Sequence, residues 1–110
     1  MKETFTSDIS YEKLIEIIKS YFKEVENLDV EFKGDLQDWR ACIQNEVTAK
    51  FFVLNNVFGE VEFFLSSEDI EEILRWFLQK NNLVFNYVTF LETVYIDYKY
   101  DLKLNNFTIK

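Results

Sequence analysis

Two stretches of the chain carry apolar residues at helical spacing. In residues 11–26 the apolar positions recur every three or four residues behind Ser10, a residue type that favours helix N-caps. In residues 67–80 the same spacing follows Ser66 or Ser67. The pattern predicts two amphipathic helices, each with one apolar stripe against a core. The stripes consist of Tyr11, Leu14, Ile17, Ile18, Tyr21 and Val25 in the first helix, and of Ile70, Ile73, Leu74 and Phe77 in the second.

Other segments alternate apolar and polar residues, which is typical of half-buried strands. Residues 28–32 alternate in this way and stop at Gly34. Residues 47–54 and 57–65 are rich in β-branched and aromatic side chains, and Asn55-Asn56 lies between them. Because Asn tolerates positive φ, we expect a tight hairpin turn at this pair.

The segment 36–44 leaves two structures open. Trp39, Ala41 and Ile43 alternate as in a strand, whereas Leu36, Trp39 and Ile43 also fit a short helix. We favour the strand.

After the second helix, residues 83–100 predict one long strand or two strands broken near Glu92. Residues 104–109 could add a final short strand. The order of elements predicts one α+β domain over residues 1–110, with a largely antiparallel sheet of about five or six strands and two helices packed on one face.

The composition predicts a protein with a hydrophobic core and without catalytic machinery. Of 110 residues, 48% are hydrophobic and 18% aromatic, which is ample for a core. There is no His, and Cys42 is the single cysteine, so His-activated nucleophiles, His-ligated metals and internal disulfides are excluded. Two isolated glycines cannot form a phosphate-binding loop. We therefore expect no enzyme activity, no cofactor and no metal.

The formal net charge of −8 restricts the partners. It opposes binding to nucleic acid and to anionic membranes, and it favours a basic protein. The first ten residues lack the apolar run of a secretory signal, and the uncharged stretch 81–91 is too short and too polar to span a membrane. With the lone cysteine, these features predict a cytoplasmic location.

Residues 51–74 contain six acidic residues and no basic one. Four of these acids begin the second helix, where the helix dipole stabilises each by about 0.3–1 kcal/mol, so capping and solubility are one explanation. Trp76, however, lies off the apolar stripe, on the side of the acids, and is either covered by the fold or available to a partner. The candidate partner-binding residues are Glu68, Asp69, Glu72 and Trp76, together with Trp39, for which core burial is the alternative.

These features favour a small acidic binding protein, foremost an inhibitor of the immunity or phage-encoded type that engages a basic protein such as a nuclease. The alternative is an assembly subunit that forms a homo-oligomer. It rests on the uncharged run 81–91, which we expect to be central in the sheet or covered by a second chain because edge strands are commonly guarded by charges. A third candidate is a nucleic-acid regulator, which would need Lys and Arg gathered on one surface.

Overall fold

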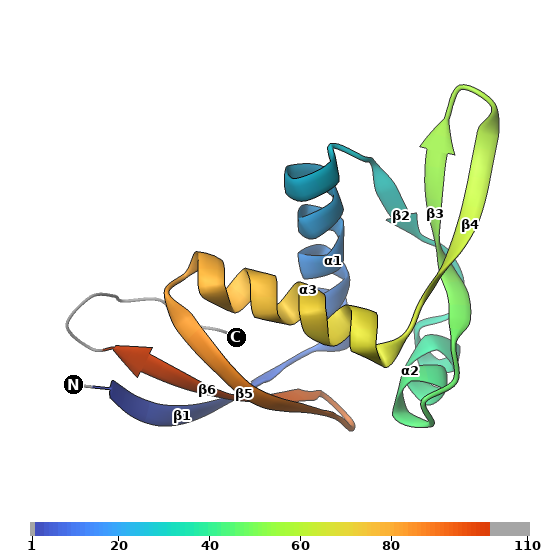
Figure 1. Cartoon of the computed structure of the whole chain (residues 1–110). Helices are drawn as coiled ribbons and strands as arrows, with labels where there is room; N and C mark the ends of the chain where they lie inside the picture. Colours follow the sequence, from blue (N-terminus) through green and yellow to red (C-terminus); the bar gives the residue numbers. More distant parts are fainter. Residues whose placement is uncertain (1, 102–110) are drawn as a thin grey trace.

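The computed structural model describes residues 2–101, and these fold into three helices and six strands of an α+β protein. The strands form two antiparallel sheets: sheet A, with the order β1-β6-β5, and sheet B, with the order β2-β3-β4 (Figure 1). The elements are β1 (Lys2–Ile9), α1 (Tyr11–Glu26), β2 (Val30–Phe32), α2 (Leu36–Gln44), β3 (Ala49–Asn56), β4 (Gly59–Leu65), α3 (Ser67–Lys80), β5 (Leu83–Phe90) and β6 (Val94–Asp101).

The two predicted amphipathic helices are confirmed as α1 and α3. The Ser10 hydroxyl accepts a hydrogen bond from the Lys13 N–H at 3.1 Å and so caps α1. Ser66 caps α3 in a reciprocal arrangement: its hydroxyl accepts from the Asp69 N–H at 3.2 Å, and the Asp69 carboxylate accepts from the Ser66 N–H at 2.9 Å. This capping box satisfies donors that the first turn of a helix leaves free.

The strand favoured for residues 36–44 is wrong, because these residues form the helix α2. Asp35 caps it by accepting a hydrogen bond from the Asp38 N–H at 3.1 Å. Trp39 and Ile43, one helical turn apart, are both buried. The cap and this spacing outweigh the short alternation that suggested a strand.

The single sheet is also wrong, because the six described strands form two three-stranded antiparallel sheets, and the packing of both helices on one face is not confirmed. Helix α3 packs on β5 of sheet A, while α1 packs on α3 and on β2 of sheet B, so the helices α1 and α3 lie between the two sheets (Figure 1). Sheet A includes β1, which the polar sequence of the first ten residues did not indicate. Its partner β6 is the last described strand, with Ile9 opposite Val94.

The expected hairpin of β3 and β4 forms, with its turn shifted along the chain. Asn55 and Asn56 belong to β3, and Val57-Phe58 makes the turn that was expected at the Asn pair. Gly59 follows with a φ of 116°, a conformation that suits glycine. The segment 83–100 forms two strands that break around Glu92, and the strand expected at residues 104–109 lies outside the described residues.

Strand β5 lies at an edge of sheet A, because it pairs only with β6 among the described strands. Within residues 2–101, the expectation that the uncharged run is central in the sheet is therefore wrong. Whether a second chain covers it stays a prediction.

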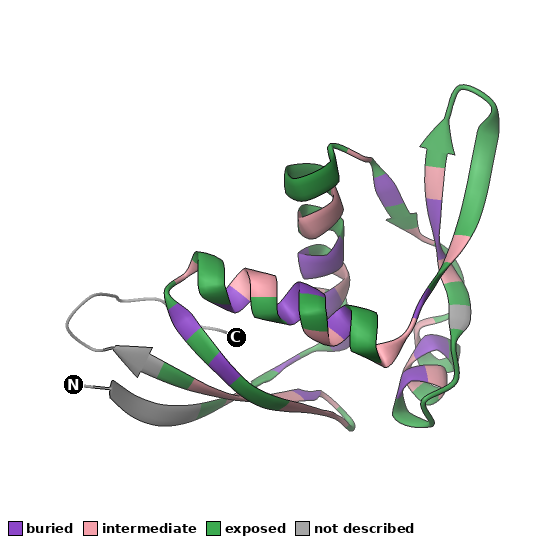
Figure 2. Ribbon diagram, in the orientation of Figure 1, coloured by how far each residue is buried: buried purple, intermediate pink, exposed green. Residues whose placement is uncertain are grey.

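The core lies where α1, α2 and α3 meet the bases of the two sheets (Figure 2). Trp39 is at its centre, with 1% of its surface exposed. Its ring makes edge contacts with Tyr11 of α1 and Phe52 of β3, each with a centroid distance of 5.6 Å. Such pairs contribute roughly 0.5–1.5 kcal/mol beyond their buried area. Trp39 thus joins sheet B to the helices.

Candidate functional site

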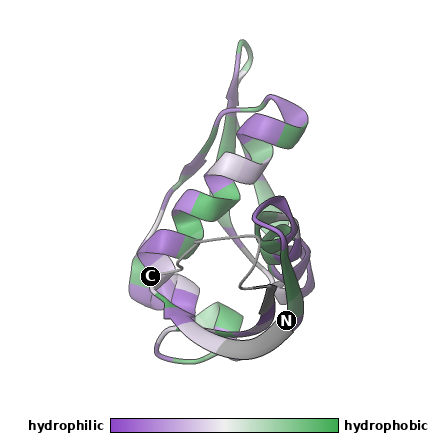
Figure 3. Cartoon of the chain, turned by 90° about the vertical axis from the view of Figure 1, so that its left-hand side faces the viewer, coloured by the Kyte–Doolittle hydropathy of each residue, from purple (hydrophilic) through white to green (hydrophobic). Residues whose placement is uncertain are grey.

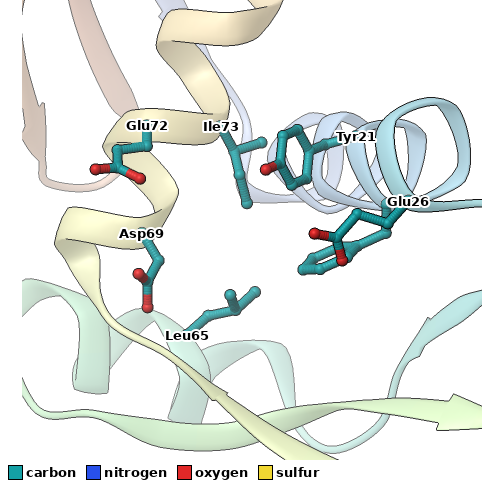
Figure 4. A pocket seen from close by; sticks show the side chains of 7 residues that line it. Tyr21, Glu26, Leu65, Asp69, Glu72 and Ile73 are labelled. Carbon is teal, nitrogen blue, oxygen red and sulfur yellow. The ribbon is translucent and has the colours of Figure 1, made fainter. Parts of the chain in front are cut away.

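A pocket of about 130 Å³ opens between the end of α1, the start of α3 and the end of β4 (Figure 4). Apolar side chains and carboxylates share its lining. Figure 4 shows Asp69 and Glu72 on α3 at one side and Glu26 of α1 at the other, with the Tyr21 ring between them. The full lining is Tyr21, Phe22, Glu26, Leu65, Asp69, Glu72 and Ile73.

The pocket therefore has an apolar floor and three carboxylates on its walls, and no basic side chain lines it. Glu26 and Glu72 are exposed, and neither forms an ion pair within the described part of the chain. Asp69 has a structural task, because one of its oxygens completes the cap of α3. The described residues hold no group of three His, Cys, Asp or Glu side chains suited to a metal ion. The arrangement suits a longer cation with an apolar stem, such as a Lys or Arg side chain.

Trp76 lies beside this pocket and is half-buried. Its ring meets the edge of Tyr21 at a centroid distance of 5.4 Å, and the Lys80 Nζ lies 5.0 Å from its centre. Lys80 in turn pairs with Glu24 of α1 at 2.8 Å. Trp76 therefore helps to join α3 to α1 and supports Tyr21 in the pocket wall, while its remaining surface is open to solvent.

The other candidate residues lie elsewhere. Glu68 is exposed and lines a separate depression with Glu46 and Glu71. Trp39 is buried, which is the core alternative that the sequence left open. Of the candidates, the structure therefore brings Asp69, Glu72 and Trp76 together, adds Glu26 to them, and leaves Glu68 and Trp39 apart.

The turn of the β3–β4 hairpin is a second exposed surface that the sequence analysis missed. Val57 and Phe58 are 93% and 95% exposed. The outer half of the hairpin is exposed along its length (Figure 2), and its turn reaches beyond the ends of the helices (Figure 3). The signal was present, because two apolar residues occupied a turn flanked by Asn and Gly, where polar residues are usual.

Apolar surface connects the pocket to this hairpin. Phe22 of the pocket lies 5.4 Å, centroid to centroid, from Phe63 of β4. Val61 is two residues from Phe63, so it lies on the same face of the strand, and it is 50% exposed. Val25, one helical turn after Tyr21, is also 50% exposed.

Several basic side chains of the described residues are engaged by acids. The described ion pairs are Lys13–Glu16, Lys23–Asp29, Lys33–Glu60, Arg40–Glu92 and Lys80–Glu24.

Comparison with known proteins gives no significant match to a protein-family model, a curated protein or a solved structure. None of the helices within residues 2–101 has the length and apolar character needed to cross a membrane.

Proposed function

We propose that the protein acts by binding a basic protein and inhibiting it, with the pocket between α1 and α3 receiving a Lys or Arg side chain of that partner. The observation that carries the proposal is the combination of an apolar floor with carboxylates from two helices. An aliphatic stem can lie on Tyr21 and Ile73 while its cation meets Glu26 or Glu72.

The net charge of −8 supports the same class of partner, because it attracts and steers a basic protein over a longer range. Nucleic acid is disfavoured, since five of the described basic side chains are already paired with acids. That binding leads to inhibition is inferred from chemical complementarity alone. An acidic surface with aromatic side chains can occupy the basic cleft of a nuclease and keep its substrate out.

The hairpin turn gives such a partner a second contact. Val57 and Phe58 project without cover, and aromatic side chains that become buried are common anchors of protein interfaces.

The first experiment identifies the partner. The purified protein is immobilised and exposed to an extract of its native host at low salt, and captured proteins are eluted with increasing salt and identified by mass spectrometry. We expect a basic protein in stoichiometric amount, because salt screens the attraction between exposed charges. The purified partner is then assayed with and without this protein, and inhibition at a one-to-one ratio is the expected result.

The second experiment tests the pocket itself. Glu72→Lys and Glu26→Lys should weaken binding to the purified partner, chiefly by slowing association, and the loss should shrink at high salt. Glu68→Lys is the matched control, since it makes the same charge change on α3 but outside the pocket. If Glu68→Lys weakens binding as much as Glu72→Lys does, net charge and not the pocket governs the interaction.

A further inference from the structure

We infer that β5 is a self-association surface, through which two copies of the chain pair edge to edge and join their A sheets into one six-stranded antiparallel sheet. This inference is independent of the proposed function, because it rests on a different edge of the molecule.

The four edge strands of the two sheets differ in charge. In sheet A, β1 carries Lys2, Glu3 and Asp8, and in sheet B, β2 carries Glu31 while β4 carries Glu60 and Glu62. Strand β5 has eight residues and no charged side chain, and the uncharged run extends over residues 81–91. Charged side chains are a usual protection of edge strands against pairing with another chain, and β5 alone lacks them.

The absence of charged side chains on β5 also indicates that its partner is a second copy of the chain. Two copies that each carry a net charge of −8 repel one another, and β5 adds no charged side chain of its own to this repulsion. When β5 pairs with a second β5 about a twofold axis, every residue faces an uncharged residue in any register. Strand β5 itself offers a basic peptide no charged side chain to pair with, whereas the pocket between α1 and α3 offers three carboxylates.

The irregularity in β5 restricts the region that pairs. The register with β6 shifts between Phe85 and Tyr87, and such a bulge disrupts regular pairing. From Tyr87 to Phe90 the register is continuous. The second copy should therefore pair with this half of the strand, near Thr89.

The symmetry limits growth to a dimer. A twofold interface uses the same edge on both copies and leaves none of it free. The outer edges of the joined sheet would be the two β1 strands, where the charge of Asp8 opposes further addition.

Thr89 is the position at which to test the pairing. It lies opposite Tyr95 in β6, on the sheet face that also holds Tyr87, away from the buried side chains Val94 and Ile96. Near the axis, Thr89→Lys brings two like charges together, which destabilises a strand pair. Val84→Glu is the matched control for Thr89→Glu, because Val84 shares this sheet face, precedes the bulge and lies opposite Lys99, where a glutamate meets no like charge.

The measurement is sedimentation velocity of the purified chain over a concentration series. The wild type should dimerise, Thr89→Lys and Thr89→Glu should each raise the dissociation constant at least about tenfold, and Val84→Glu should change it little. An equimolar mixture of Thr89→Lys and Thr89→Glu should restore the dimer as a heterodimer. In the wild-type dimer, the amides of residues 87–90 should exchange more slowly as concentration rises.

Three results would overturn the inference. A wild type that stays monomeric at about 100 µM, well above the micromolar range, has no such interface. A dimer that Thr89→Lys leaves intact uses another surface. A mixture of the two charged variants that stays monomeric shows that Thr89 acts through the fold of the strand and not across an axis.

Discussion

The two hairpins of the protein have strands of similar length but different turns. At the β5–β6 turn, the Tyr11 hydroxyl donates to the Leu91 carbonyl at 3.0 Å, and Arg40 pairs with Glu92 at 2.6 Å. These contacts tie the turn to α1 and α2. At the β3–β4 turn, Val57 and Phe58 are 93% and 95% exposed and project into solvent (Figure 2).

This difference between the two turns shows that apolar character alone does not decide which hairpin residues stabilise the fold. Phe52 and Phe58 lie six positions apart in the same hairpin, yet 1% of Phe52 and 95% of Phe58 are exposed. Only the base of the β3–β4 hairpin reaches the core, because that is where α1 and α2 pack. The predicted consequence is a steep fall in sensitivity to mutation from base to turn.

The largest effect is expected at the base. Phe52→Ala should reduce the free energy of unfolding by about 3–5 kcal/mol, because it removes a ring packed against Trp39 and leaves a cavity. Urea denaturation followed by tryptophan fluorescence measures this change. A loss below about 1 kcal/mol would mean that the base is no better packed than the turn.

Two glycines allow a second comparison within the β3–β4 hairpin. Gly34 lies against Phe51 near the base of this hairpin, and Gly59 lies at its turn. Gly34 has a φ of 131°, and an added Cβ would lie 2.7 Å from the Phe51 Cδ1. Gly59 has a φ of 116° and open space around it. Gly34→Ala should therefore destabilise by about 1–3 kcal/mol, and by more than Gly59→Ala, which adds backbone strain without a clash. Equal losses in the two variants would show that the Phe51 ring simply moves aside.

The anchored turn of the other hairpin should be sensitive to pH. Tyr11→Phe removes the hydrogen bond to Leu91 and should cost about 1 kcal/mol at neutral pH. Burial raises the pKa of the Tyr11 hydroxyl above its ordinary value of 10.0. The wild type should therefore keep its advantage below pH 10 and lose it as pH rises through the higher pKa of the folded state. Stability curves of both proteins from pH 8 to pH 11 measure this, and a constant difference would contradict it.

Local patterns in the sequence were sufficient for much of the fold. The caps at Ser10 and Ser66 and the spacing behind them predicted α1 and α3. Runs of β-branched and aromatic residues predicted the β3–β4 hairpin, and they left residues 83–100 open as one long strand or two. Residues 36–44 were too short for the pattern to decide, and the cap at Asp35 was the signal that would have identified α2.

Contacts between distant parts of the chain could not be predicted in this way. The pairing of β1 with β6 joins the two ends of the described chain, and β1 has little apolar pattern. The same holds for the pocket: Asp69, Glu72 and Trp76 share a helix face, but Glu26 joins them only because α1 packs on α3. The burial of Trp39 likewise depends on three elements that meet around it.

The smallest effect on stability is expected at the free turn. Phe58→Ala should change the free energy of unfolding by no more than about 0.5 kcal/mol, because the ring is 95% exposed and its removal leaves no cavity. The turn itself should persist, since the Phe58 N–H donates to the Asn56 side chain at 2.8 Å and this bond needs no ring. Thermal melting and amide exchange in the hairpin measure the outcome.

The same variant should have a large effect on binding if the turn contacts the basic partner that we propose. A buried aromatic anchor contributes about 2 kcal/mol or more, which would appear mainly as faster dissociation. Phe58→Ala would then separate stability from binding, and Phe52→Ala, a deletion of the same size in the same hairpin, would mainly reduce stability. If Phe58→Ala lowers stability as Phe52→Ala does, the turn packs against the rest of the protein in solution, and the contrast between the two hairpins disappears.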